Sequence, residues 1–172
     1  MGKLEGKVAL ITGAGQGIGQ GIALALAKEG AVIAVAGRTE SKLHTTCGLL
    51  ADIGARGEAV VCDVSKKDDI AAAVDRTVEL FGGIDILVNN ASAIDLSRTL
   101  DLAPKRYDLM ADVNARGTFM LTRAALPHLL KSPNPHVLTL SPPLDLSPRN
   151  FAPHPAYSVA KFGMSLYAMA MA

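Results

Sequence analysis

The chain is poor in several residue types that would point to particular classes of protein. It has no tryptophan, 4% aromatic residues and only two cysteines in 172 residues. Cys47 and Cys62 form neither a C-x-x-C pair nor a zinc-ligand spacing, so the sequence is not a disulfide scaffold or a zinc module. We therefore expect reduced thiols and a cytoplasmic location.

Net charge and long apolar runs are also scarce. The formal net charge is +1, which gives no electrostatic support for nucleic-acid binding. No apolar run approaches the roughly 18 residues of a membrane span, and the N-terminus lacks the apolar centre of a signal peptide. The four histidines are scattered without a ligand pattern, so no metal site is predicted. A small molecule is the expected partner.

Apolar runs and helical stretches alternate along the chain, of which 49% is apolar. The patterns predict strands at 7–11, 31–36, 59–62, 84–88 and 136–140. They predict helices at 17–29, 40–53, 66–81 with Ser65 as N-cap, 104–113, 114–131 with a kink at Pro127, and 155–172, and a loop at 141–155. Such alternation is typical of an α/β fold, a doubly wound parallel sheet with helices on both faces.

A glycine-rich turn joins the first predicted strand to the first helix. Its glycines fall as Gly13-x-x-x-Gly17-x-Gly19, rather than in the G-x-G-x-x-G spacing. Glycines let the backbone approach a pyrophosphate, and the bare N–H groups of a helix N-terminus attract an anion. The alternative is a flexible turn that merely closes a strand–helix unit. The order strand, glycines, helix favours a dinucleotide site.

Tyr157 and Lys161 lie four residues apart in the last predicted helix, so they share one face. A phenol is a poor acid near neutral pH because its ordinary pKa is about 10. A nearby ammonium favours the phenolate and makes proton transfer at neutral pH easier. Alone, Y-x-x-x-K occurs by chance in many helices.

Together these motifs resemble the short-chain dehydrogenase/reductase superfamily. The resemblance rests on T-G-x-x-x-G-I-G at 12–19, Asn89-Asn90-Ala91, a serine, and Y-x-x-x-K, in this order. The stretches 89–94, 107–110, 113–118 and 140–144 are most similar to the hydroxysteroid dehydrogenase-like branch and its bacterial relatives named citronellol-type dehydrogenases. The resemblance implies a Rossmann-type fold and an oxidoreductase.

The resemblance implies a nicotinamide cofactor. Gly13, Gly17 and Gly19, with the Ile18 N–H, are expected at its pyrophosphate. The second strand ends at 36–39 without the acidic residue that would bind the ribose of NAD, and Arg38 there suits a 2′-phosphate. We therefore expect NADP(H), with NAD(H) possible; the alternative is a solvated surface arginine.

Four further residues are expected near the cofactor. Asp63-Val64 resembles the family's contact to the adenine ring, although Asp63 could equally cap its own loop. Asn90 and Ala91 are expected near the cofactor ribose, where a plain strand-end turn is the alternative.

Asn114, Ser141, Tyr157 and Lys161 match the family's catalytic tetrad. The resemblance implies that Ser141 hydrogen-bonds the substrate oxygen and that Tyr157 transfers the proton. It implies that Lys161 favours the phenolate and holds the nicotinamide ribose, while Asn114 supports a water that links Lys161 to solvent. Ser141 lies 16 residues before Tyr157, farther than is common in the superfamily, and could instead merely end the fifth strand.

Residues 1–172 are interpreted as one dinucleotide-binding domain whose C-terminal part is missing, since superfamily members usually continue through further strands. The expected activity is hydride transfer between NADP(H) and an alcohol or carbonyl group of an apolar small molecule. We expect the chain alone to turn over slowly or not at all, and its full-length parent to be active. We also expect that parent to be a homo-oligomer, weakened here because a pairing helix is cut short. The alternative is an inactive nucleotide-binding fragment or an interaction module.

Overall fold

The structure, a computed structural model, describes residues 2–172 apart from the side chain of Phe151. Its strands are β1 (Val8–Thr12), β2 (Val32–Gly37), β3 (Gly57–Val61), β4 (Ile86–Asn89) and β5 (His136–Thr139). Its helical elements are α1 (Gly17–Lys28), α2 (Glu40–Asp52), α3 (Lys67–Phe81), α4 (Pro104–Met110), the π-helical η1 (Ala111–Arg116), α5 (Gly117–Leu129), α6 (Pro148–Phe151) and α7 (Pro155–Ala170).

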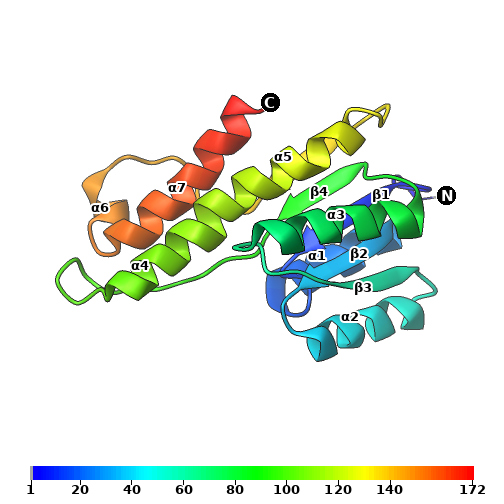
Figure 1. The fold of residues 1–172 in the computed structure, drawn as a ribbon, viewed down its shortest axis with the longest axis horizontal. Coiled ribbons are helices and arrows are strands. Elements are labelled where there is room, and N and C mark those ends of the chain that lie inside the picture. The colour runs from blue at the N-terminus through cyan, green and yellow to red at the C-terminus, as the bar shows by residue number, and fades with distance from the viewer. Residues whose placement is uncertain (1) are drawn as a thin grey trace.

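All strand pairs are parallel, and the order across the sheet is β3-β2-β1-β4-β5. Figure 1 shows the sheet between α3 and the α4–α5 helix on one side and α1 and α2 on the other. This confirms the doubly wound parallel architecture. The chain moves from β1 outwards through β2 to β3, then returns to β4 on the other flank of β1. This reversal opens a crevice at the carboxyl ends of β1 and β4.

The core has two layers because side chains alternate across the buried strands. Ala9 and Ile11 of β1 lie in the cluster that includes Leu43 and Leu50 of α2. Leu10, between them, lies in the other cluster, with residues of α3 and α5. Both faces of β1 are therefore covered, and the loops at its carboxyl end are firmly supported.

Residues 104–129 form one continuous helix, in contrast to the predicted break between 113 and 114. The middle of this helix, η1, is π-helical, and α5 runs through Pro127 before it ends at Leu129. Pro127 lies inside the last turn of α5, so the helix does not end at the proline, although Pro127 has no N–H to donate to the carbonyl four residues earlier. The kink there stays a prediction. The π-helical segment contains Asn114, and such segments frequently occur at functional sites.

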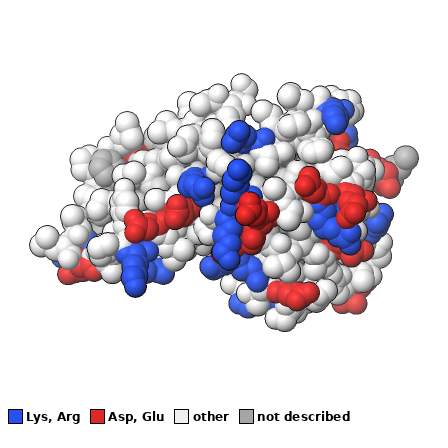
Figure 2. All heavy atoms as spheres, viewed as in Figure 1, with Lys and Arg blue, Asp and Glu red and all other residues white. Residues whose placement is uncertain are grey.

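Helix α7 lies alongside η1, and Gly163 approaches Ala115 so closely that an added Cβ would lie 3.3 Å from the Ala115 Cβ. Of the charged residues only Lys161 belongs to α7, and the area where Figure 1 places this helix is nearly free of charge in Figure 2. The loop predicted at 141–155 contains the short helix α6. No helix among the described residues has both the length and the apolar character needed to cross a membrane.

Candidate active site

The glycine turn between β1 and α1 can hold only glycine at several positions. Gly13 and Gly17 have positive φ angles of 64° and 57°. A Cβ on Gly13 would lie 2.9 Å from Asn90 Nδ2, and one on Gly19 would lie 2.4 Å from the Gly13 carbonyl oxygen. The backbone is thus bare where a ligand would approach. Since no side chain caps α1 and its first turn contains no acidic residue, its N–H groups can receive an anion.

Polar groups tie this turn to the end of β4. The Thr12 hydroxyl donates to the Val88 carbonyl at 3.2 Å and accepts from the backbone N–H groups of Asn90 and Ala91 at 3.1 Å each. The Asn90 amide donates to the carbonyls of Thr12 at 2.8 Å and Gly13 at 3.3 Å. These hydrogen bonds hold the two strand ends together and leave the glycine N–H groups free.

A cleft of about 450 Å³ opens above these strand ends. Every predicted cofactor residue outside α7 lines it, namely Gly13, Gly17, Ile18, Gly19, Arg38, Asp63, Val64, Asn90 and Ala91. Its volume is in the range of cofactor pockets. The bare glycine backbone and the size of the cleft fit a dinucleotide.

The polar residues Gln16 and Lys42 also line this cleft and were not predicted from the sequence. The Lys42 ammonium donates to Gln16 Oε1 at 2.6 Å. One signal could have identified Lys42, because it follows Arg38 by four residues at the start of the second helix.

Asp63 forms a turn of its own at the rim of the cleft. Its Oδ1 accepts from the backbone N–H of Ser65 at 3.0 Å and from the Ser65 hydroxyl at 2.8 Å. Burial alone would raise the pKa of Asp63, but these two hydrogen bonds and the positive charges of Arg38 and Lys66 outweigh it and lower the pKa. Asp63 therefore caps its loop through Oδ1. Its second carboxylate oxygen accepts no hydrogen bond from the residues that the structure describes.

Ser65 is not the N-cap of the third helix, as the sequence analysis predicted. The N-cap of α3 is Lys66, and no side chain bonds to the first turn there. The backbone N–H of Ser65 instead closes an Asx turn with Asp63, and the Ser65 hydroxyl donates to the same carboxylate oxygen.

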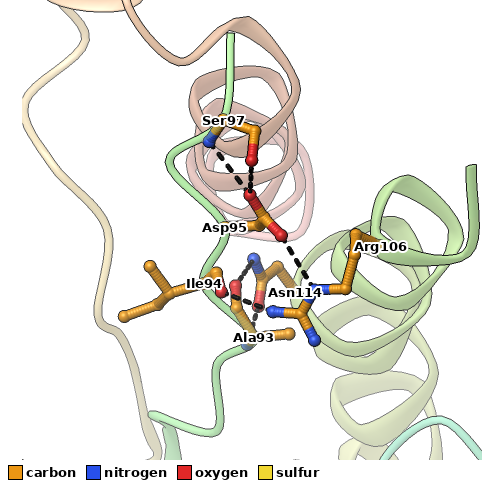
Figure 3. A network of polar contacts seen from close by, with 6 residues as sticks. All are labelled: Ala93, Ile94, Asp95, Ser97, Arg106 and Asn114. Carbon is orange, nitrogen blue, oxygen red and sulfur yellow. Dashed lines mark hydrogen bonds and ion pairs between the residues drawn. The ribbon is translucent and has the colours of Figure 1, made fainter. Parts of the chain in front are cut away.

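Asn114 is fully buried and bonds the segment that follows β4. Its Oδ1 accepts from the Ala93 N–H at 2.8 Å, and its Nδ2 donates to the Ala93 carbonyl at 2.9 Å. Figure 3 shows this pair beside Ile94. Since Ala93 and Ile94 both line the cleft, Asn114 fixes part of its wall from within η1.

An ion pair holds the same segment from the surface. Arg106 donates to Asp95 Oδ2 at 2.9 Å and to the Ile94 carbonyl at 2.7 Å (Figure 3). The Ser97 hydroxyl, followed by Arg106, lowers the pKa of Asp95 to about 2, so the carboxylate is ionised at neutral pH. One ring nitrogen of His154, just before α7, lies 2.8 Å from the Leu96 carbonyl. The wall of the cleft is thereby linked to both α4 and α7.

Three predicted catalytic side chains belong to α7 or to the end of β5. Lys161 is buried, and its Nζ donates to the Leu140 carbonyl at 2.5 Å. Burial lowers the pKa of Lys161, so it gives up its proton more readily than a surface lysine. Tyr157 lies one turn earlier on the same helix and is half-buried. It is not among the described residues that line the cleft.

Ser141 is bonded to the backbone of α7. Its hydroxyl donates to the Lys161 carbonyl at 2.6 Å and accepts from the Ser165 hydroxyl at 2.7 Å. The structure therefore brings Ser141 and Lys161 together. A hydroxyl has one proton and two lone pairs, so Ser141 keeps one free lone pair in this arrangement.

The chain matches the family model for short chain dehydrogenases over residues 7–172, and it belongs to this family. It is 46% identical to the human hydroxysteroid dehydrogenase-like protein 2 and 49% identical to the Bos taurus protein of the same name. Each match covers 99% of this chain and 43% of the relative, so the chain spans less than half the length of these curated relatives.

Solved structures agree with this assignment. A short chain dehydrogenase from Mycobacterium thermoresistibile has a TM-score of 0.94 at 39% identity, over 98% of this chain and 62% of that one. A metagenomic short-chain oxidoreductase in complex with NADP has a TM-score of 0.89 at 30% identity, over 98% and 76%. These relatives support a nicotinamide cofactor for the family.

Proposed function

We propose that residues 1–172 form the dinucleotide-binding domain of an oxidoreductase that transfers hydride between NADP(H) and an alcohol or carbonyl group of an apolar small molecule. The observation that carries the proposal is the bare glycine cradle beside Arg38. No acidic residue ends β2, where an acid would select NAD. The cradle suits a pyrophosphate, and the Arg38 guanidinium suits the additional phosphate of NADP(H).

In this proposal the cofactor is held along the whole cleft. Gly13, Gly17, Ile18 and Gly19 bind the pyrophosphate through backbone N–H groups. Asp63 and Val64 would bind the adenine, Asn90 and Ala91 would bind a ribose, and Tyr157 and Lys161 would hold the nicotinamide ribose. When bound, the nicotinamide would donate the hydride in reduction and accept it in oxidation.

Tyr157 acts as the acid or base at the substrate oxygen. In reduction its phenol donates a proton to that oxygen, and in oxidation its phenolate accepts one. Lys161 lies one turn away on the same helix. The buried, more acidic Lys161 ammonium can also pass a proton towards Tyr157. Asn114 supports the water that connects Lys161 to solvent.

Ser141 orients the substrate oxygen in the same proposal. The single hydroxyl proton of an alcohol goes to Tyr157, so Ser141 would act as a donor to the substrate oxygen in both directions. To donate there, the Ser141 hydroxyl must first leave the Lys161 carbonyl.

An apolar substrate is supported by the wall of the cleft nearest α4. Ala93, Ile94, Leu109 and Val113 line it there, and the Ile94 side chain is exposed.

A cytoplasmic location is supported by Cys47 and Cys62, which are both free thiols. Burial raises the pKa of Cys62 to about 12, which makes this thiol unreactive at neutral pH.

We further propose that the protein is a homo-oligomer that pairs through α7. A groove lined by Tyr107, Val159, Leu166, Tyr167 and neighbouring small residues runs between α4, η1 and α7. Its exposed apolar side chains would be costly in water. Sedimentation that shows only monomers at all concentrations would contradict this.

A second function, a non-catalytic nucleotide-binding or interaction module, is favoured by two observations. Tyr157 is not among the described residues that line the cleft, and the Ser141 proton is already used within the protein. A binding assay combined with a single-turnover assay distinguishes the two functions. If NADPH binds and a panel of apolar aldehydes, ketones and alcohols reacts, the chain is an enzyme. If NADPH binds and nothing in the panel reacts even in a single turnover, the nucleotide-binding module is correct. If neither NADPH nor NADH binds, the oxidoreductase and the nucleotide-binding module are both wrong, and only the interaction module is left.

A further inference from the structure

We propose that Lys42 is a second cation for the 2′-phosphate of NADP(H), and that Gln16 holds its ammonium at the cleft until the phosphate arrives. The inference rests on the proposed function, because it assigns a further specificity-determining residue to the same cleft. It rests on charge, on one short hydrogen bond, and on the packing of α2 against the glycine turn.

Lys42 and Arg38 are two cations of the cleft. Of the described residues that line the cleft, Arg38, Lys42 and Asp63 carry charge. Lys42 lies in the first turn of α2, where its N–H donates to the Thr39 carbonyl at 3.0 Å, and Arg38 immediately precedes Thr39. Both cations are exposed, so an anion from solvent can reach them. Two positive charges against one negative charge suit a dianionic phosphate.

The hydrogen bond to Gln16 keeps the Lys42 ammonium available. The 2.6 Å contact to Gln16 Oε1 positions the ammonium but does not neutralise it, since an amide oxygen carries no net charge. Lys42 forms no ion pair with any residue that the structure describes. An ammonium has three donors, and this contact uses one, so two remain for phosphate oxygens.

The packing around Lys42 fixes its position relative to the glycine turn. An added Cβ on Gly15 would lie 2.9 Å from the Lys42 Cβ, so helix and turn are in close contact. One helical turn later, the Thr46 hydroxyl donates to the Ala14 carbonyl at 3.0 Å and accepts from Gln20 at 2.9 Å. Because α2 is bonded to the turn, the backbone of Lys42 is already in place before a ligand binds. Binding therefore costs little conformational entropy in this part of the helix.

The test compares dissociation constants of NADPH and NADH by calorimetry for the chain and its Lys42→Met variant. The expected result is about tenfold weaker binding of NADPH, with NADH unchanged, because one charge-assisted contact to the phosphate is lost. Lys28→Met is the matched control, since Lys28 is an exposed lysine of α1 outside the cleft, and it should change neither constant. The same comparison with 2′,5′-ADP and 5′-AMP isolates the contribution of the 2′-phosphate, because the two ligands differ only in that group.

The outcomes separate this inference from the proposed function. If Lys42→Met leaves the NADPH/NADH ratio unchanged while Arg38→Met lowers it, the role of Lys42 is wrong and the NADP(H) proposal stands. If neither variant alters the ratio, both are wrong. If Lys42→Met weakens NADPH and NADH equally, Lys42 is a structural residue and the inference is overturned.

Gln16→Glu provides a second, independent variant. A carboxylate at this position would pair with the Lys42 ammonium and repel an incoming phosphate. We expect NADPH to bind more weakly and NADH to bind as before, and we expect the loss to shrink when Lys42→Met is added. If Gln16→Glu weakened NADPH binding by the same factor in the unchanged chain and in the Lys42→Met variant, the inference would be overturned.

Discussion

The centre of the sheet, which supports the cofactor end of the molecule, and the β5 edge differ in how completely they are buried. Around β1, β2 and β4, every strand residue is buried or nearly so, and the loops above them form one continuous cleft. At the β5 end, Val137 and Leu138 are 41% and 46% exposed, and α7 presents an apolar outer surface. Tyr157 lies at this second end, outside the cleft lining.

This difference separates the part of the molecule proposed to bind the cofactor from the part proposed to carry out the chemistry. The cofactor end is held by hydrogen bonds among Thr12, Asn90 and the glycine turn, none of which involves β5 or α7. At the other end, Ser141, Lys161 and Ser165 bond to one another. Cofactor binding should therefore depend mainly on the glycine turn and the end of β4, and the chemistry on the contacts of α7 with η1, α4 and β5.

The largest expected effect comes from a substitution that leaves the cofactor end intact. Tyr157→Phe should lower turnover of a reactive carbonyl with NADPH by about 10²- to 10⁴-fold, the usual contribution of a general acid. The dissociation constant of NADPH should change little. Single-turnover absorbance of NADPH measures the first, and calorimetry measures the second.

Tyr167→Phe is the control for this prediction. Tyr167 lies on the same helix, and its ring packs against Phe119 with centroids 5.1 Å apart, a contact that survives loss of the hydroxyl. Turnover by this variant should match that of the unchanged chain. Equal turnover by Tyr157→Phe and Tyr167→Phe would remove Tyr157 from the chemistry.

The next largest effect is expected in the glycine turn, at the cofactor end of the molecule. Gly19→Ala puts a Cβ 2.4 Å from the Gly13 carbonyl oxygen, so we expect a loss of about 1–3 kcal/mol in the free energy of unfolding and loss of NADPH binding. Gly21→Ala, in the same helix with no atom within 4 Å of its Cβ, should instead raise stability by about 1 kcal/mol or less. Denaturant titration compares the two. Similar destabilisation by both would contradict the close packing of the turn.

A third effect concerns stability alone. Asp85 accepts hydrogen bonds from Ser132 at 2.5 Å, the Val8 N–H at 2.9 Å and Lys7 at 3.2 Å. Asp85→Ala should therefore cost about 2 kcal/mol at pH 7. Asp75→Ala, at an exposed position of α3, should change stability by no more than about 0.5 kcal/mol.

The contribution of Asp85 should also depend on pH. Burial alone would raise its pKa, but the hydrogen bonds from Ser132, Val8 and Lys7 lower it below the usual value. A carboxyl with a lowered folded pKa stabilises the fold above its unfolded pKa, about 3.9, and loses that contribution as pH falls through the folded pKa. The difference between Asp85→Ala and the unchanged chain should thus shrink below about pH 4. A difference that persists at pH 2 would exclude this account.

The smallest effect should come from Ser141→Ala. Loss of its hydrogen bond to the Lys161 carbonyl should cost about 1 kcal/mol of stability. If Ser141 also orients the substrate, turnover should fall more than in Ser165→Ala, which removes only the donor to Ser141. Identical turnover by the two variants would leave Ser141 as a link between β5 and α7 only.

The sequence predicted the fold well for a physical reason. Buried parallel strands are continuous apolar runs, and a turn such as 13–19 requires glycine wherever a Cβ would clash, so both leave a local signal. The nine predicted cofactor residues outside α7, several of them expected only from the family resemblance, line one cleft. Their contacts with a cofactor stay a prediction.

The remaining features depend on contacts between distant segments, which leave no local signal. The π-helical turn at 111–116 belongs to a helix that fits against α7, and the predicted break at 113–114 was wrong. The partner of Lys42 lies 26 residues away, at Gln16. Ser65 hydrogen-bonds Asp63 and does not cap α3. Both interactions are short-range, and the sequence does not decide between them.

The measurement that tests the central claim most directly is a thermal melt of the 172-residue chain with NADPH, with NADH and without either. Our account predicts one cooperative transition that both cofactors raise, with a larger rise for NADPH at equal concentration, because ligand binding to the folded state alone adds to stability. A broad transition that neither cofactor shifts would show that the cleft does not form a cofactor site in this chain. A larger rise with NADH would contradict the role of Arg38.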